Sequence, residues 1–372
     1  MSFLRCFSAV GLSACCLAAW PGCGSSGASA GDAAAADGGR DGTSDTGTTG
    51  DADAGDLTDA ADDSDADAAE ASLPAGVLVN GQAGPGGIAV DGANVYWANH
   101  VGGEIMKCAI AGCNDSPTIL ASGQLYPSGV AVDATSVYWT NQGVTGTDGQ
   151  VMKCAIDGCS GAPTVIASGQ AFPQGIAVDE ASVYFVDNGV TTVDGQVVKC
   201  DLDGSHAGVL ASGQGGPLGI AVDLSNVYWT NNDSGEVLSC AIGGCNDAPT
   251  VLASGFDDPL GIAVNATEIF WTTHGGGQVF GCAIGGCSGN PTLLASGQGG
   301  PQNIAATAAR VFWTNHDAME VMECAASGCG AGPTLFASSQ SVPTGIAIDA
   351  ANVYWTNYGA GATDGQVIVR PQ

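Results

Sequence analysis

Three of the four histidines stand at one recurring position, directly after a short Trp-x-Asn or Trp-x-Thr motif. They are His100, His274 and His316. A neutral imidazole ligates divalent metals and also transfers protons near neutral pH, so the pattern admits a metal site or acid–base chemistry. Residues 74–372 contain no HExxH, Glu-x-His or GxSxG motif and no glycine-rich phosphate loop. We therefore predict no catalytic residue, no metal ligand set and no cofactor, and expect a protein that is not an enzyme.

The position held by these histidines carries a different residue in other copies of the motif. We take the seven positions together as a candidate ligand face, formed by His100, Gln142, Asn188, Asn232, His274, His316 and Tyr358. Residues that contact a ligand vary in this way while the letters around them repeat. Neutral sequence drift on an exposed surface is the alternative explanation for this variation.

Ten of the 15 cysteines form five Cys-x4-Cys pairs, namely Cys108 with Cys113, Cys154 with Cys159, Cys240 with Cys245, Cys282 with Cys287, and Cys324 with Cys329. In an exported protein such pairs form disulfides. A structural zinc site needs four converging ligands, which pairs in separate repeats do not supply, and free thiols are the remaining alternative. Cys200 stands alone because Ser205 occupies the position of its partner.

All these residues belong to one repeat, Pro-x-Gly-Ile-Ala-Val-Asp-x-x-x-Val-Tyr-Trp-Thr-Asn. Its copies begin at Pro85, Pro127, Pro173, Pro217, Pro259, Pro301 and Pro343, at spacings of 42, 46, 44, 42, 42 and 42 residues. Propellers and helical solenoids share that period. The segments GIAVD, NVYWTN, GEVLSCAI and PTVLASG are short, rich in β-branched and aromatic residues, and bounded by Gly, Pro, Asp or Asn, which indicates four strands per repeat. We predict an all-β fold, a seven-bladed β-propeller of four-stranded blades over residues 74–372.

The ends of this domain predict how the ring closes. The last repeat stops at Gln372 after three strands, and a segment resembling the missing fourth strand precedes the first repeat, because Gly76–Gln82 aligns with Thr118–Gln124. We expect an N-terminal strand at 75–79 to complete the last blade and to remove an exposed sheet edge.

Most repeated letters have a structural explanation. We assign the recurring Trp to packing between blades, and the Asp that ends the first strand to a tight turn. The Gln of Ala-Ser-Gly-Gln is expected on the same side of the ring as the candidate ligand face. Longer loops between the second and third strands of three repeats, NQGVTGTDGQ, DNGVTTVDGQ and NYGAGATDGQ, lie on this side too.

The motif Tyr-Trp-Thr-Asn, at Tyr138–Asn141, Tyr228–Asn231 and Tyr354–Asn357, resembles the YWTD repeats of LDL-receptor-type propellers and, more loosely, NHL-type propellers. The resemblance spans 74–372 and implies the fold without a particular ligand. The chain departs from the YWTD family by its Asn in place of Asp and by seven blades where the family usually has six. It also resembles the predicted secreted propeller lipoproteins of myxobacteria.

The amino terminus reads as an export signal. Arg5 precedes an apolar run that ends at Trp20, and the segment resembles a bacterial lipoprotein signal in which residues 1–22 are removed and Cys23 is lipidated. Leu12–Cys15 offers an alternative lipidation site at Cys15. Secretion without a lipid is a third possibility.

The net charge of the chain excludes some classes of partner. Acidic residues number 37 against 7 Lys and Arg, a formal net charge of −30, so nucleic acid and anionic lipid surfaces are excluded as partners. Residues 24–73 hold 13 of the acidic residues within Ala, Gly, Ser and Thr, which is typical of a disordered linker, and we place this linker at 23–73. Membrane attachment is expected only through the lipid anchor.

We therefore expect a monomeric outer-membrane or cell-surface lipoprotein, or otherwise a secreted protein. Its propeller is expected to bind an extracellular protein, peptide or glycan. Two alternatives remain open, namely a lyase or lactonase with a divalent metal in the channel, and a structural protein of the envelope or matrix.

Overall fold

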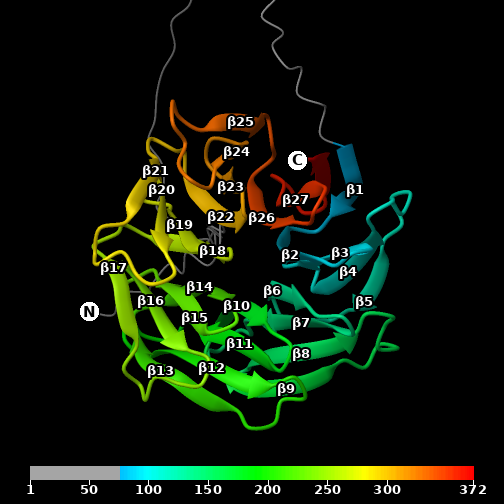
Figure 1. Cartoon of the computed structure of the whole chain (residues 1–372). Coiled ribbons are helices and arrows are strands. Elements are labelled where there is room, and N and C mark those ends of the chain that lie inside the picture. Colours follow the sequence, from blue (N-terminus) through cyan, green and yellow to red (C-terminus); the bar gives the residue numbers. More distant parts are fainter. Residues whose placement is uncertain (1–75) are drawn as a thin grey trace, which may run out of the picture. The chain divides into compact units, whose positions relative to one another are not determined.

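The computed structural model describes residues 76–372. The expected signal peptide at 1–22, the linker at 23–73 and the lipidation sites Cys23 and Cys15 lie outside the described residues. Within the described part, the predicted fold is confirmed: seven antiparallel sheets of four strands each form a β-propeller (Figure 1). No helix of this part is long and apolar enough to cross a membrane.

Two strands of each blade lie toward the centre of the ring. The innermost strands begin at the repeat prolines and contact one another around the ring; they are β2 (Pro85–Val90), β6 (Pro127–Val132), β10 (Pro173–Val178), β14 (Pro217–Val222), β18 (Pro259–Val264), β22 (Pro301–Ala306) and β26 (Pro343–Ile348). The second strands carry the Tyr-Trp-Thr-Asn motif; they are β3 (Asn94–Asn99), β7 (Ser136–Asn141), β11 (Ser182–Asp187), β15 (Asn226–Asn231), β19 (Glu268–Thr273), β23 (Arg310–Asn315) and β27 (Asn352–Asn357).

Two further strands complete each blade on the outside. The third strands are β4 (Glu104–Ala109), β8 (Gly149–Ala155), β12 (Gly195–Asp201), β16 (Glu236–Ala241), β20 (Gln278–Ala283), β24 (Glu320–Ala325) and β28 (Gly365–Pro371). The outermost strands are β5 (Thr118–Ala121), β9 (Thr164–Gln170), β13 (Gly208–Gln214), β17 (Thr250–Ser254), β21 (Thr292–Ala295), β25 (Thr334–Ala337) and β1 (Gly76–Gln82). Blades one to six contain β2–β5 to β22–β25 in order, and blade seven combines β26–β28 with β1.

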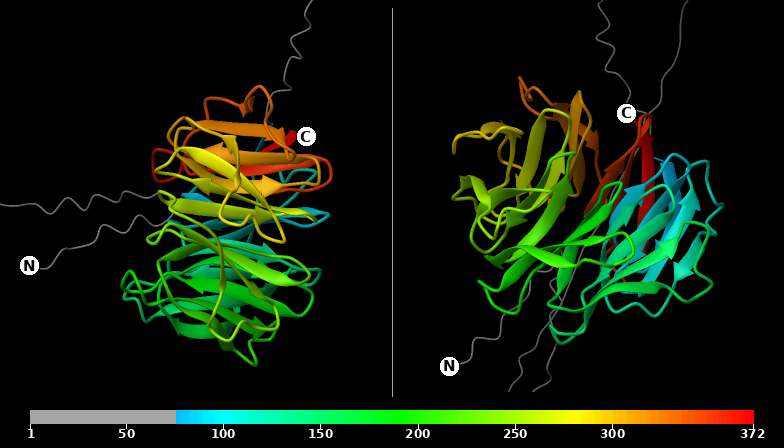
Figure 2. Two further views of the ribbon diagram at one scale, coloured as in Figure 1. Left: turned by 60° about the vertical axis from the view of Figure 1, so that its left-hand side comes forward. Right: turned by 60° about the horizontal axis from the view of Figure 1, so that its bottom comes forward.

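The ring closes as the sequence predicts. β1 pairs antiparallel with β28, with Val77 opposite Ile368, and the two strands lie side by side in Figure 1. β1 extends to Gln82, three residues beyond the expected end at 79, because Gln82 still pairs with Gly365 after a bulge. Figure 2 shows the neighbouring sheets facing one another around the ring.

The core lies between blades. Each buried cluster combines side chains from two neighbouring blades, as where Tyr96 of blade one packs with Trp139 of blade two. The Trp side chains of six blades are fully buried, and Phe185 takes the same place in blade three. The recurring Trp therefore has the packing role expected for it.

The glycine of Pro-x-Gly-Ile allows the inner strands to approach. A Cβ atom at Gly87 would lie 2.1 Å from the carbonyl oxygen of Ser128 in the next inner strand, whereas one at Gly86 would meet nothing within 4 Å. The Thr of Tyr-Trp-Thr-Asn adds a hydrogen bond there, since Thr140 Oγ1 donates to the carbonyl oxygen of Gln174 at 2.6 Å. These contacts fix the width of the central channel.

The turn and cysteine assignments also agree with the structure. Asp91 Oδ1 accepts hydrogen bonds from two backbone N–H groups of its turn, and its Oδ2 accepts one from Tyr96 Oη at 2.7 Å. All five Cys-x4-Cys pairs form disulfides within single blades. Cys200 is a buried free cysteine.

Candidate functional site

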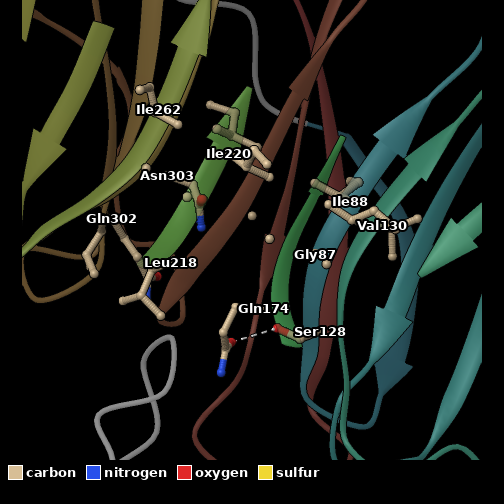
Figure 3. A pocket seen from close by; sticks show the side chains of 18 residues that line it. Gly87, Ile88, Ser128, Val130, Gln174, Leu218, Ile220, Ile262, Gln302 and Asn303 are labelled. Atoms are coloured by element: carbon tan, nitrogen blue, oxygen red, sulfur yellow. Dashed lines mark hydrogen bonds between the residues drawn. The ribbon is translucent and has the colours of Figure 1, made fainter. Parts of the chain in front are cut away.

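A pocket of about 160 Å³ lies in the channel where the inner strands converge (Figure 3). Much of its wall is the repeated Gly-Ile pair. Blades differ at the x of Pro-x-Gly-Ile, whose side chains in the wall are Ser128, Gln174, Leu218, Leu260 and Gln302, joined by Asn303. The chemistry of the pocket is therefore set mainly by this variable position in five blades and by Asn303.

Of the two glutamines at the x of Pro-x-Gly-Ile, Gln174 is hydrogen-bonded through its side chain and Gln302 is not. Gln174 Oε1 accepts hydrogen bonds from Gln142 Nε2 at 2.9 Å and from Ser128 Oγ at 3.4 Å, and Figure 3 shows Ser128 and Gln174 turned toward each other. Gln302 is 1% exposed, and neither its Nε2 nor its Oε1 has a partner among the described residues. A buried unpaired amide is costly, so Gln302 is the side chain in the pocket wall whose N–H donors and acceptor oxygen most need a partner.

The structure brings the seven residues of the candidate ligand face to one side of the ring. In every blade the backbone N–H of this residue donates to the carbonyl oxygen of the residue before the repeat proline, as from His100 to Gly84 at 2.9 Å and from Tyr358 to Val342 at 2.9 Å. Gln142, Asn188, Asn232, His274 and His316 make the same bond. The seven positions thus form a ring around the mouth of the channel.

Side chains of this ring reach toward the next blade. His100 Nδ1 lies 3.1 Å from the carbonyl oxygen of Pro127, and its imidazole packs 5.3 Å from the ring of Tyr126. Burial lowers the pKa of His100, because it penalises the charged imidazolium. Tyr358 has a buried hydroxyl without a partner in the described chain, and burial raises its pKa to about 12.

One cluster of possible metal ligands exists among the described residues. His274, His316 and Asp317 each offer a ligand atom, and these three atoms lie within 4.8 Å of one another. Asp317 Oδ1 lies 2.7 Å from His316 Nδ1, and its Oδ2 lies 3.9 Å from His274 Nε2. His316 Nε2 is buried and has no hydrogen-bond partner there. Two imidazoles and a carboxylate are a donor set that suits a divalent transition metal with open coordination positions.

Sequence reasoning missed Asp317 and the pocket side chains. Asp317 directly follows His316, one step beyond the position that was compared between repeats. The pocket residues stand at the x of Pro-x-Gly-Ile, which varies from Gly86 to Leu218 to Gln302. A comparison of every variable letter in the repeat, and not only of the letter after Trp-Thr-Asn, would have found both.

The Gln of Ala-Ser-Gly-Gln is structural. Gln214 Oε1, at the end of blade three, accepts hydrogen bonds from Trp229 Nε1 at 2.9 Å and from Asn231 Nδ2 at 3.1 Å, both in blade four. Gln82 makes the same two contacts with Trp97 and Asn99. The Gln therefore connects one blade to the Trp of the next and is committed to the fold.

Blade three lacks both of these donors. Phe185 replaces the Trp, and Asp187 replaces the Asn of the motif. Asp187 is 5% exposed, and its Oδ1 has no hydrogen-bond partner in the described chain. Burial raises the pKa of Asp187 from 3.8 to about 6.

A serine, a histidine and an aspartate also meet between β12 and β13. Ser205 Oγ and Asp201 Oδ2 both contact the same nitrogen, His206 Nδ1, at 3.2 and 2.7 Å. A hydrolase triad uses the two imidazole nitrogens separately, one for the nucleophile and one for the acid. The His206 side chain is also 84% exposed, so this group is a surface turn.

No protein-family model matches the chain, and no curated protein matches it. Among solved structures, virginiamycin B lyase from Staphylococcus aureus is 15% identical, with a TM-score of 0.63 over 80% of this chain and 98% of that one. The nidogen/laminin complex contains a YWTD-type propeller that is 19% identical, with a TM-score of 0.50 over 66% and 94%. A gluconolactonase from Xanthomonas campestris is 12% identical, with a TM-score of 0.51 over 80% and 89%. At these identities the likenesses show the propeller fold, which occurs here in binding modules and in enzymes.

Proposed function

We propose that the protein is an exported binding module whose ligand, an extracellular protein, peptide or glycan, binds at the channel mouth. The observation that carries the proposal is the unpaired amide of Gln302, buried in the wall of the pocket. Blades four and five place leucine at the same position, so the fold does not require an amide there. An amide that the fold leaves unpaired in a pocket wall can be satisfied by a ligand that supplies the partner.

The test compares the wild-type protein with Gln302→Leu. Leucine occurs naturally at the equivalent Leu218 and Leu260, so the variant is expected to fold with equal or greater stability. The wild type, Gln302→Leu and a control variant are immobilised and exposed to envelope and medium fractions of the producing cells. We expect material retained by the wild type to be lost by Gln302→Leu and kept by Glu180→Gln, an exposed control on the opposite side of the ring. Equal retention by all three proteins would overturn the proposal.

A second candidate function is a metal-dependent enzyme, a lyase or lactonase. The specific observation in its favour is the cluster of His274, His316 and Asp317, whose donor set suits a divalent metal. The similar structures include a lyase and a gluconolactonase. Among the described residues that line the pocket there is no His, Asp or Glu to act as general acid or base, which is why binding is the first candidate.

Metal analysis separates the two candidates. If the protein is such an enzyme, the purified chain retains about one equivalent of metal after dialysis, His274→Ala and His316→Ala both lose it, and lactone or ester opening is lost with it. His100→Ala, at the same position in blade one, is the matched control. A protein that takes up no divalent metal in a calorimetric titration is not this enzyme.

Export and anchoring complete the proposal. Five disulfides fit an oxidising compartment outside the cytoplasm. The lipoprotein-like signal places a lipid anchor at Cys23 in this proposal. Palmitate labelling should disappear in Cys23→Ser and persist in Cys15→Ser. The reverse result would place the anchor at Cys15. Absence of label from the wild type and from both variants would indicate secretion without a lipid.

A further inference from the structure

The residue before each repeat proline has a left-handed backbone in all seven blades. These residues, which we name the pre-proline ring, have φ between 52° and 66°; they are Gly84, Tyr126, Phe172, Gly216, Asp258, Gly300 and Val342. Glycine adopts this conformation freely, whereas aromatic and β-branched residues do so at a cost. Four blades nevertheless carry a side chain there.

The fold does not require those four side chains. Blades one, four and six close with glycine at the same position and with the same hydrogen bond to the residue after the Trp motif. Strained backbone of this kind persists mainly where a side chain has a function. Tyr126 contacts the ring of His100 within the fold, and the part of its side chain that stays exposed is open to a ligand.

Several side chains over blades one to three are apolar and exposed. We name Val101, Leu125, Tyr126, Phe172 and Val190 the apolar arc. Val101, Leu125, Tyr126 and Val190 are each about half exposed, at 48–53%. Phe172 and Val190 flank the loop of blade two, since a Cβ at Gly146 would lie within 3.0 Å of both. The arc is thus a nearly continuous apolar strip along one side of the mouth.

The side chains over blades four to six are acidic. We name the exposed Asp233, Asp257, Asp258 and Asp317 the acidic arc. Asp233 and Asp317 stand on the same loops as the candidate ligand face, and Asp257 and Asp258 stand on the connection between β17 and β18. Asp317 and His274 converge over Gly300. The Lys and Arg residues of the described chain all lie in the halves of their strands away from this side of the ring. A cationic group is therefore attracted to the acidic arc without competition.

We propose that the pre-proline ring and its two arcs bind an extended basic peptide segment. Its apolar side chains lie on the apolar arc, its Lys or Arg side chains reach the acidic arc, and one backbone amide pairs with Gln302, whose free donor and acceptor match a peptide group. This proposal rests on the proposed binding function and names the chemistry of its ligand.

The probes are three labelled ten-residue peptides, in which leucine alternates with lysine, glutamate or serine. Fluorescence anisotropy with the full chain is expected to show binding of the lysine peptide alone, weakening as salt rises. Tyr126→Gly combined with Phe172→Gly, and Asp258→Asn combined with Asp317→Asn, should each weaken binding by about tenfold or more. The melting temperature of the glycine variant is compared with that of the wild type, because glycine relieves the left-handed backbone but removes the contact of Tyr126 with His100.

Two control variants carry changes on the opposite side of the ring, Leu224→Ala at a 95% exposed leucine and Glu180→Gln at an exposed carboxylate. Both should bind the lysine peptide as the wild type does. Equal binding of the lysine and glutamate peptides, or wild-type affinity in the ring variants, would overturn this inference. In that case the retention experiment with Gln302→Leu still decides the proposed function on its own.

Discussion

Gln214 accepts a hydrogen bond from the indole of Trp229, with 2.9 Å between Oε1 and Nε1, and this bond joins the outermost strand of blade three to the second strand of blade four. The same oxygen accepts the amide of Asn231. One side chain thus satisfies two buried donors across a blade boundary, and the same pair of bonds recurs at five of the seven boundaries.

Gln214→Ala should therefore be strongly destabilising. It leaves Trp229 Nε1 and Asn231 Nδ2 buried without an acceptor, at a cost of about 2–4 kcal/mol. Urea unfolding of the variant and of Ser254→Ala, an exposed serine in the neighbouring outer strand, measures the difference. If the two variants unfold at the same urea concentration, the bond does not stabilise the ring.

Gly87→Ala and Gly86→Ala form a matched pair of neighbours. The first places a methyl group against the carbonyl oxygen of Ser128 and forces two inner strands apart, whereas the second points into open space. We expect Gly87→Ala to lose about 1–3 kcal/mol or more and Gly86→Ala to remain near the wild type. Similar melting temperatures for the two variants would show that the neighbouring inner strands leave room for a methyl group at Gly87.

Asp187→Asn should stabilise the protein at neutral pH. The folded-state pKa of Asp187, about 6, is above its ordinary 3.8, so the folded state favours the protonated form and loses stability as pH rises from about 4 to 6. The substitution removes this penalty, about 2–3 kcal/mol at pH 7.5.

Unfolding at pH 7.5 and at pH 4 tests the pH dependence of Asp187→Asn, because the pH-dependent gain should vanish at the lower pH. Glu180→Gln removes an exposed charge from the same blade and serves as the control for charge alone. A gain that is the same at both pH values would mean that Asp187 is ionised without cost in the folded protein.

The intact protein should be lighter by ten hydrogens than its reduced form, two for each of the five bridges. Replacing Cys240 and Cys245 together by serine should cost about 2 kcal/mol, because the bridge closes only a short loop. Under reducing conditions the variant and the wild type should unfold alike. A difference that survives reduction would come from the serines and not from the bridge.

Much of the fold could be predicted from the sequence because seven copies of one repeat show the same pattern of strands and turns. Proline starts each inner strand, and the alignment of Gly76–Gln82 with Thr118–Gln124 is enough to identify the closing strand. The cysteine spacing likewise predicts the bridges, since both partners lie within one short loop.

The candidate site was harder to predict from the sequence, because the repeat does not show which residues of neighbouring blades contact one another. The Gln of Ala-Ser-Gly-Gln was expected on the ligand side, but its bonds to Trp and Asn cross a blade boundary that the sequence does not display. Blade five shows the coupling: Phe256 replaces the Gln and Thr273 the Asn, and Phe256 packs edge-on against Trp271 at 5.5 Å. The left-handed backbone before proline is likewise a conformational property, which the letters Tyr126 and Phe172 do not reveal.

The pairing of β1 with β28 is one of the last strand pairings that can form while the chain is being synthesised. Val77 lies opposite Ile368, so its partner is synthesised only after nearly the whole domain has emerged. Until then β1 and the growing end of the sheet array are open edges, able to pair with another chain. A slow contact of such long sequence separation is the step at which folding competes with misassembly. The join therefore acts as a checkpoint on completeness, because a chain that stops short of β28 leaves its first strand available for exchange with a neighbour.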